Sequence, residues 1–144
     1  MADAILHLEG VDIYQRDNLV LSNVNLKIER GEFFYLIGKT GSGKSSLMKT
    51  LYGDLELVKG NGKVVEFDLK LMKEKDIPFL RRKIGIVFQD FKLLNDRTVF
   101  DNLLFVLKAT GWTDKDAMTN KIHEVLDKVD MKTKDYKKPF ELSG

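Results

Sequence analysis

The sequence predicts an α/β protein in which strands fill the first half of the chain and helices the second. Three observations predict this fold class: apolar and polar residues alternate near the start, an almost wholly apolar run at 32–37 leads into a glycine-rich loop, and helical spacing begins at Thr98. The 144 residues, 43% of them hydrophobic and 32% charged, are enough to enclose a core of ordinary size. We expect two regions, residues 1–88 and residues 89–144.

Strands are expected first. In VNLKIERGE the apolar residues that start at Val24 alternate with polar ones, which is the period of a half-buried strand. ILHLEGVDIYQ (5–15) is a looser version, with a turn at 16–18. NGKVVEF (61–67) predicts a further turn and strand. The apolar runs EFFYLI (32–37) and KIGIVF (83–88) predict strands that are covered on both faces of a parallel sheet.

Three helices are expected from apolar residues at helical spacing. The first, KSSLMKTLYG, ends at Gly53. Its predicted apolar face consists of Leu47, Met48, Leu51 and Tyr52. TVFDNLLFVLKATG is apolar on more than one side, so we expect this second helix to pack against other elements. The third helix, within TDKDAMTNKIHEVLDKVD, carries an apolar stripe made of Ala117, Met118, Ile122, Val125, Leu126 and Val129.

The composition excludes several classes of protein. The absence of cysteine rules out disulfides and thiolate metal sites, and the two histidines, His7 and His123, lie far apart without neighbouring metal ligands. The net charge of +2 does not favour nucleic acid as a partner. The sequence shows neither a signal-peptide leader nor an apolar run of about 18 residues, so we expect no direct insertion into a membrane.

A glycine-rich loop carries the strongest functional signal. Gly38 and Gly43 are separated by four residues and followed by Lys44 and Ser45, which is the P-loop pattern in its required place between a strand and a helix. Glycines let backbone amides approach a bulky anion, and the start of the helix adds unpaired donors. Lys44 then neutralises the terminal phosphates, and Ser45 offers its hydroxyl to Mg²⁺.

The predicted phosphate-binding residues are Gly38, Lys39, Thr40, Gly41, Ser42, Gly43, Lys44, Ser45 and Ser46. The alternative is a flexible glycine turn with a surface lysine. The pattern does not select one class of nucleotide-binding protein, because kinases, GTPases, motor proteins and transport ATPases share it. The sequence pattern leaves two alternative roles for each of two other residues. Tyr14 is either a core aromatic or a ligand residue, and Gln89, at the end of an apolar run, is either a loop residue or a functional one.

The chain resembles the ATP-binding subunits of ABC transporters. The resemblance lies in the order and spacing of four features: Tyr14, the P-loop, Gln89 and the LSG at 142–144. The resemblance implies a P-loop NTPase fold of the ABC type, with an antiparallel β subdomain, a RecA-like core and the start of a helical subdomain. It implies that Tyr14 stacks on adenine and that Gln89 positions Mg²⁺ and the attacking water. In a homodimer, the signature residues would face the ATP of the other copy; these are Leu142, Ser143 and Gly144.

Within that family, the stretch DIPFLRRKIGIVFQDFKLLNDRTVFDNL resembles the cell-division branch, the FtsE proteins. This resemblance implies a membrane partner of the FtsX type and a peripheral location on the cytoplasmic side of the membrane. ATPases of lipoprotein release and macrolide export, a non-hydrolysing docking module and a P-loop kinase are the alternatives. Phe91, Leu93 and Leu94 would either anchor a helix of the membrane partner or fill the core of the domain itself.

The chain ends at Gly144, inside the signature. The resemblance places a magnesium-binding aspartate, a general-base glutamate and a γ-phosphate-sensing histidine after that point. We therefore expect a chain of these 144 residues to retain part of an ATP site, with Lys44 and Gln89 as its catalytic residues, and to show little hydrolysis. Apolar sheet edges that lack their neighbours should favour aggregation.

Overall fold

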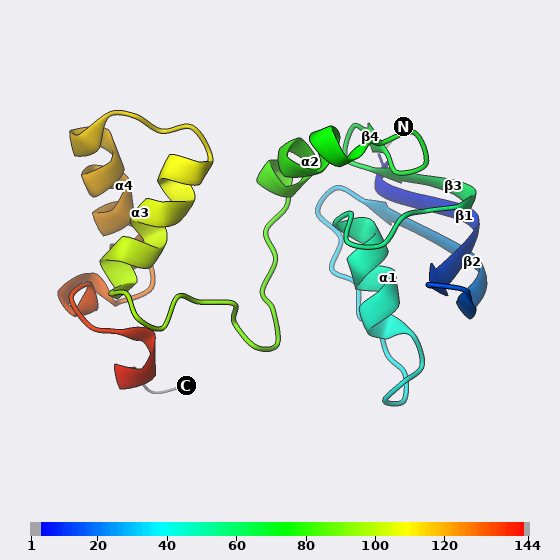
Figure 1. The fold of residues 1–144 in the computed structure, drawn as a ribbon, viewed down its shortest axis with the longest axis horizontal. Coiled ribbons are helices and arrows are strands. Elements are labelled where there is room, and N and C mark those ends of the chain that lie inside the picture. Colours follow the sequence, from blue (N-terminus) through cyan, green and yellow to red (C-terminus); the bar gives the residue numbers. More distant parts are fainter. Residues whose placement is uncertain (1–3, 143–144) are drawn as a thin grey trace. The chain divides into compact units, whose positions relative to one another are not determined.

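A computed structural model describes residues 4–142 of the chain (Figure 1). The chain divides into two compact units, residues 1–85 and 86–144. The first unit contains β1 (Ala4–Gln15), β2 (Asn18–Glu29), α1 (Lys44–Leu51), β3 (Lys59–Val64), β4 (Phe67–Asp68), the 3-10 turn η1 (Glu74–Asp76) and α2 (Ile77–Lys83). The second contains α3 (Val99–Ala109), α4 (Lys115–Asp127) and the 3-10 turns η2 (Lys132–Lys134) and η3 (Pro139–Glu141).

The first unit is built on a four-stranded antiparallel sheet in the order β2-β1-β3-β4. β1 and β2 form a hairpin whose last pair is Gln15 opposite Asn18, with a turn at residues 16 and 17. Along β2 the apolar residues from Val24 onward are half-buried, whereas the intervening Asn25 and Lys27 are exposed. The predicted hairpin and its alternation are therefore confirmed. The strand expected within 61–67 is confirmed at residues 61–64, but the turn follows this strand at residues 65 and 66 instead of preceding it.

The core of the first unit lies between this sheet and its helices. α1 contributes Leu47 and α2 contributes Leu80, which has no exposed surface. The buried cluster consists of Leu8, Val11, Ile13, Leu47, Leu57, Val64, Leu69 and Leu80. α1, the helix that follows the glycine loop, is thus anchored to β1 by the hydrophobic effect.

The two buried parallel strands expected at 32–37 and 83–88 do not form. Residues 32–39 have no regular secondary structure, and Ile37 is 88% exposed. Lys83 ends α2, residues 85–88 are irregular, and Val87 is 92% exposed. A strand needs a neighbour whose backbone satisfies its N–H and C=O groups, and no strand among residues 4–142 pairs with either run. An apolar run predicts a tendency to pair, not the presence of the partner.

The buried face of α1 also differs from the prediction. Met48 is 45% exposed, and the residues that α1 buries are Ser46, Leu47 and Thr50. The buried side of the helix therefore combines Leu47 and the half-buried Leu51, as predicted, with the small polar residues Ser46 and Thr50 in place of Met48. The Thr50 hydroxyl donates to the Ser46 carbonyl oxygen at 3.0 Å. The expected end at Gly53 is confirmed, because its φ is +75° and its N–H donates to the Thr50 carbonyl oxygen.

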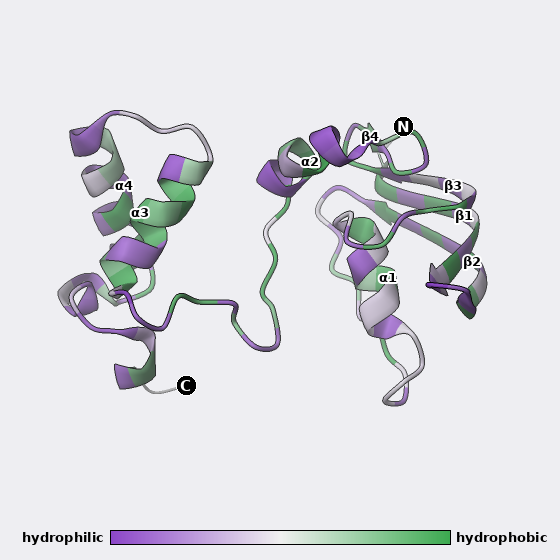
Figure 2. Cartoon of the chain, viewed as in Figure 1, coloured by the Kyte–Doolittle hydropathy of each residue, from purple (hydrophilic) through white to green (hydrophobic). Residues whose placement is uncertain are grey.

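The second unit is built around α3 and α4. Each begins with a side-chain cap: the Thr98 hydroxyl accepts from the Asp101 N–H, and the Asp114 carboxylate accepts from the Ala117 N–H. The stripe of α4 is confirmed at Met118, Ile122 and Leu126, which are buried, but Ala117 and Val129 are exposed. α3 is largely hydrophobic (Figure 2), yet none of its residues is fully buried in the described part of the chain.

Among the helices of residues 4–142, none has both the length and the apolar composition required to cross a bilayer.

Candidate functional site

The glycine-rich loop lies in the first unit, directly before α1. A side chain on Gly38 would bring its Cβ within 2.5 Å of the Ser42 Oγ, because the loop folds back there and the Ser42 N–H donates to the Lys39 carbonyl oxygen at 3.1 Å. Gly41 has φ +79° with open space around it. The loop is thus closed on itself by its own backbone, and Gly38 is needed for space while Gly41 is needed for conformation.

Gly43 is required for both reasons. Its φ is +95°, and an added Cβ would lie 2.8 Å from the Leu21 Cγ and 3.1 Å from the Val20 Cγ1. The end of the loop therefore rests directly on β2. Sequence reasoning identified the glycine but not this support, because Val20 and Leu21 lie more than twenty residues earlier and carry no motif.

The start of α1 is open. Gly43 occupies the N-cap position without a side-chain hydrogen bond, and the first turn contains no acidic residue. Within the described chain, the N–H groups of Lys44, Ser45 and Ser46 donate to no protein acceptor. Free amides and the positive end of the helix dipole favour an anion at this place.

The Lys44 ammonium lies over the loop. It donates to the carbonyl oxygens of Gly38 and Lys39, to the latter at 2.8 Å, and it is 3.3 Å from the Ser42 Oγ. Lys44 is thus already turned toward the space that the loop surrounds. A polyphosphate entering there would replace these neutral carbonyl acceptors with anionic oxygens, so that both partners of each hydrogen bond would be charged.

The two serines after Lys44 face different surroundings. Ser45 is exposed, whereas Ser46 is 5% exposed and its carbonyl oxygen accepts the Thr50 hydroxyl. Ser45 therefore has an accessible hydroxyl oxygen, which is the kind of ligand that Mg²⁺ prefers. Ser46 contributes only its amide. The residues that the structure describes contain no cluster of three acidic, His or Cys side chains that would hold a metal by itself.

Tyr14 lies close to the loop through β2. It is half-buried on β1 opposite Leu19, and Leu21, on which Gly43 rests, lies two residues further along the same strand. The structure thus places Tyr14 on the hairpin against which Gly43, the last glycine of the loop, packs. A planar ring near a phosphate site is the arrangement that stacking of a nucleotide base requires.

Gln89 belongs to the second unit, where it is exposed in a turn. The turn is closed by the Phe91 N–H, which donates to the Phe88 carbonyl oxygen at 3.0 Å, and both Phe91 and Lys92 have positive φ angles. Lys92 pairs with Asp90 at 2.7 Å and thereby lowers the pKa of that carboxyl group. Residues other than glycine rarely adopt positive φ angles, so Gln89 belongs to an unusual turn.

The segment after this turn exposes two of its three apolar side chains. Phe91 is 66% exposed and Leu93 is exposed too, so neither fills a core among the described residues, whereas Leu94 is half-buried. Asn102 of α3 holds the Leu94 backbone: its Oδ1 accepts the Leu94 N–H at 2.8 Å, and its Nδ2 donates to the Leu94 carbonyl oxygen at 3.0 Å. A polar asparagine inside an apolar helix was the available signal for this contact.

The signature lies at the edge of the described chain. Leu142 is half-buried, and its N–H donates to the Pro139 carbonyl oxygen at 3.1 Å. Ser143 and Gly144 lie outside the described residues.

Comparison with known proteins identifies the family of the chain. Residues 21–144 match the family model described as "ABC transporter". The chain belongs to the ABC transporter family. Its curated relatives include the cell division ATP-binding protein FtsE of Bacillus subtilis, 44% identical over 86% of the chain and 54% of the relative. FtsE of Streptococcus pneumoniae is 38% identical over 91% of the chain and 56% of the relative. The prediction of an ABC ATP-binding subunit similar to FtsE is confirmed.

Other relatives belong to a different branch. The methionine import ATP-binding protein MetN of Clostridium acetobutylicum is 35% identical over 97% of the chain and 43% of the relative. The chain spans about half the length of the FtsE relatives named above.

Solved structures confirm the fold class. The dimeric ATP-binding cassette MJ0796 bound to ADP and Pi has a TM-score of 0.79 at 27% identity, with 96% of this chain and 63% of that chain covered. CbiO1 of Clostridium perfringens, part of the transporter complex cbiONQ, has a TM-score of 0.83 at 27% identity. The match covers 98% of this chain and 56% of the CbiO1 chain.

Proposed function

We propose that this chain is the ATP-binding portion of an ATP-hydrolysing subunit that acts with an FtsX-type membrane protein in bacterial cell division. The observation that carries the proposal is the uncapped N-terminus of α1, where free amides and the Lys44 ammonium surround a loop closed by glycines. Similarity to FtsE proteins selects the branch of the family.

The site residues take distinct roles in this proposal. The loop amides of residues 38–46 and Lys44 bind the phosphates of ATP, and Tyr14 stacks on the adenine ring. Ser45 and Gln89 hold Mg²⁺, and Gln89 orients the attacking water. Catalysis then consists of positioning and charge neutralisation around an in-line attack, because phosphoryl transfer asks little covalent chemistry of the protein.

Calorimetric titration of the full chain with Mg-ATP tests the nucleotide site. Lys44→Ala should weaken ATP binding about tenfold or more, since a charge-assisted hydrogen bond contributes roughly 1.5–3 kcal/mol. Lys49→Ala is the matched control, because Lys49 lies in the last turn of the same helix and loses the same charge. The absence of ATP binding by the wild type, or equal affinities of the two variants, would refute the proposal.

The proposed assembly is a homodimer that sandwiches two ATP molecules, with the signature residues 142–144 of one copy against the phosphates of the other. Dimeric cassettes among the structural neighbours support this. The FtsX-type partner would hold the subunit on the cytoplasmic side of the membrane. A membrane subunit of an importer is the second candidate, because MetN proteins are also relatives; membrane subunits of lipoprotein-release or macrolide-export type remain further alternatives.

Exposed side chains after Gln89 provide the test of the partner. Phe91→Ala should weaken co-purification with an FtsX-type protein while ATP affinity stays unchanged, because Phe91 is exposed and lies outside the unit that contains the glycine loop. Tyr136→Ala, another exposed aromatic of the same unit, is the control. Selective co-purification of an importer-type or exporter-type membrane subunit instead would replace the cell-division role with one of the alternatives.

A further inference from the structure

Asp12 is the one charged residue that the described part of the chain buries, with 4% of its surface exposed. Its Oδ2 accepts a hydrogen bond from the Lys59 Nζ at 2.6 Å, and its Oδ1 accepts from the Asn23 N–H at 2.8 Å and the Ser22 hydroxyl at 3.2 Å. Asp12 belongs to β1, Asn23 to β2 and Lys59 to β3, so a single carboxylate joins three strands. These partners offset the cost of burying the carboxylate, and removing one of them would leave the charge incompletely compensated.

The sheet is irregular at this place. The register of β1 against β2 shifts on both sides of Ile13, and its register against β3 shifts between Glu9 and Asp12. Asn23 has φ +54°, and a side chain on Gly60 would lie 2.4 Å from the Gly10 carbonyl oxygen. The ladder is therefore interrupted by register shifts at this place, and the Asp12 contacts tie the three strands together where the pairing is irregular.

Tyr14 lies immediately beyond this irregular stretch. It is two residues from Asp12 and directly follows the register shift between Ile13 and Tyr14. Lys59 of β3 is both the backbone partner and the ion-pair partner of Asp12. The hydrogen bond and charge of Asp12 raise the pKa of the Lys59 ammonium.

We propose that the Asp12–Lys59 pair is a positioning device for the base of the bound nucleotide. The carboxylate, which bonds to Lys59, Asn23 and Ser22, fixes the irregular end of β1 two residues before Tyr14, so that the ring keeps one orientation for stacking. The pair acts through Tyr14 and does not touch the phosphates, which are held on the loop before α1. This inference rests on the proposed nucleotide-binding function and adds residues that determine how the base is bound.

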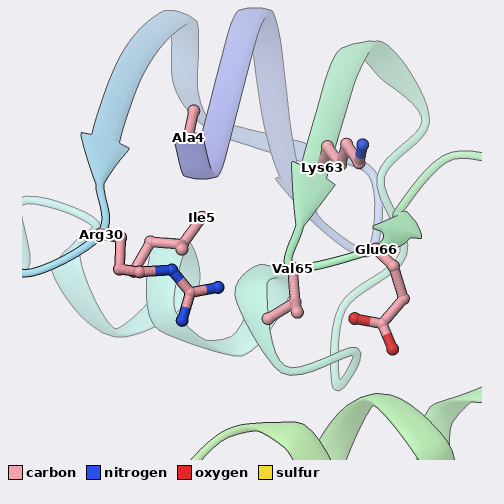
Figure 3. A pocket seen from close by; sticks show the side chains of 6 residues that line it. All are labelled: Ala4, Ile5, Arg30, Lys63, Val65 and Glu66. Carbon is pink, nitrogen blue, oxygen red and sulfur yellow. The ribbon is translucent and has the colours of Figure 1, made fainter. Parts of the chain in front are cut away.

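Lys63 offers a matched control on the same strand. Its backbone pairs with His7 of β1, and its side chain lines a separate cavity of about 270 Å³ together with Arg30 and Glu66. Figure 3 shows the Lys63 amine directed away from the Arg30 guanidinium and the Glu66 carboxylate, so the charged groups of this cavity do not converge on one point. Replacing Lys63 removes one positive charge from β3 without disturbing Asp12.

The test compares the affinity of the full chain for Mg-ATP with its affinity for magnesium-bound inorganic triphosphate, which has no base. Lys59→Met should reduce the affinity for ATP about threefold to tenfold, a part of the full stacking contribution, and leave the affinity for triphosphate unchanged. Lys59→Arg should restore most of the loss, and Lys63→Met should change neither affinity. Tyr14→Ala should show the larger loss for ATP alone.

The outcomes separate this inference from the function on which it rests. If the wild type binds neither ligand, the nucleotide-binding function fails and the inference fails with it. If Tyr14→Ala lowers the affinity for ATP but Lys59→Met does not, the positioning role alone is refuted. A drop in thermal stability of Lys59→Met with an unchanged ratio of the two affinities would mean that the pair only holds the strands together. Because Lys59 is 68% exposed at its side chain, Lys59→Met should fold even if Asp12→Asn does not.

Discussion

Two glycines of the phosphate loop should respond very differently to the same substitution. Gly41 and Gly43 both have positive φ angles, +79° and +95°, which disfavour any side chain by about 1–2 kcal/mol. They differ in their surroundings: a Cβ on Gly41 meets nothing within 4 Å, whereas a Cβ on Gly43 would lie 2.8 Å from the Leu21 Cγ and 2.9 Å from its Cδ2.

The magnitudes follow from this difference. Gly41→Ala should lower the free energy of unfolding by about 1–2 kcal/mol through backbone strain alone. Gly43→Ala should add an overpacking cost of about 1–3 kcal/mol, for a total of roughly 2–5 kcal/mol. Urea unfolding of both variants, monitored by circular dichroism, measures the two values directly.

A double substitution tests the cause. Leu21→Ala removes the two closest atoms, so Gly43→Ala should cost about 1–3 kcal/mol less in that background than in the wild type. The reasoning is refuted if Gly43→Ala is no more destabilising than Gly41→Ala, or if its cost is the same with and without Leu21. Either result would mean that the loop does not rest on β2.

Three further predictions concern the two units. Leu80→Ala should lower the free energy of unfolding by about 2–5 kcal/mol in urea, whereas Leu71→Ala, at a side chain 75% exposed, should change it little. Lys128, at the C-cap of α4, and Lys121 within the helix lower the pKa of Glu124 from 4.5 to about 2, so its stabilising contribution is present above pH 4.5 and is lost as the pH falls toward 2; NMR titration of this carboxyl should give that pKa, and a value near 4.5 would exclude the contacts. Asn102→Ala leaves the half-buried Leu94 N–H without its acceptor, so amide hydrogen exchange at Leu94 should accelerate, with about 1–3 kcal/mol lost; unchanged exchange would contradict this.

The features that could be predicted from the sequence are those that depend on residues close together in the chain. The alternation after Val24, the glycine at the end of α1 and the threonine that caps α3 each act within a few residues, and the structure contains all three. The P-loop belongs to the same class, because its glycines and Lys44 form one short segment whose contacts are local.

The features that could not be predicted depend on residues far apart in the chain. Whether EFFYLI forms a strand is decided by a neighbour that supplies backbone hydrogen bonds, and its apolar composition is the same with or without one. Which side of α1 is buried was also decided by tertiary contacts, since Met48 and Leu47 are equally apolar in the sequence.

The sequence by itself therefore determined the family, the phosphate loop and the local hairpin and helices of this protein. The tertiary structure decided that Gly43 rests on Leu21, that Asp12 joins three strands beside Tyr14, and that Asn102 holds the backbone of Leu94. The physical reason is that local patterns restrict the backbone of a short segment, whereas contacts between distant residues depend on how the segments pack together.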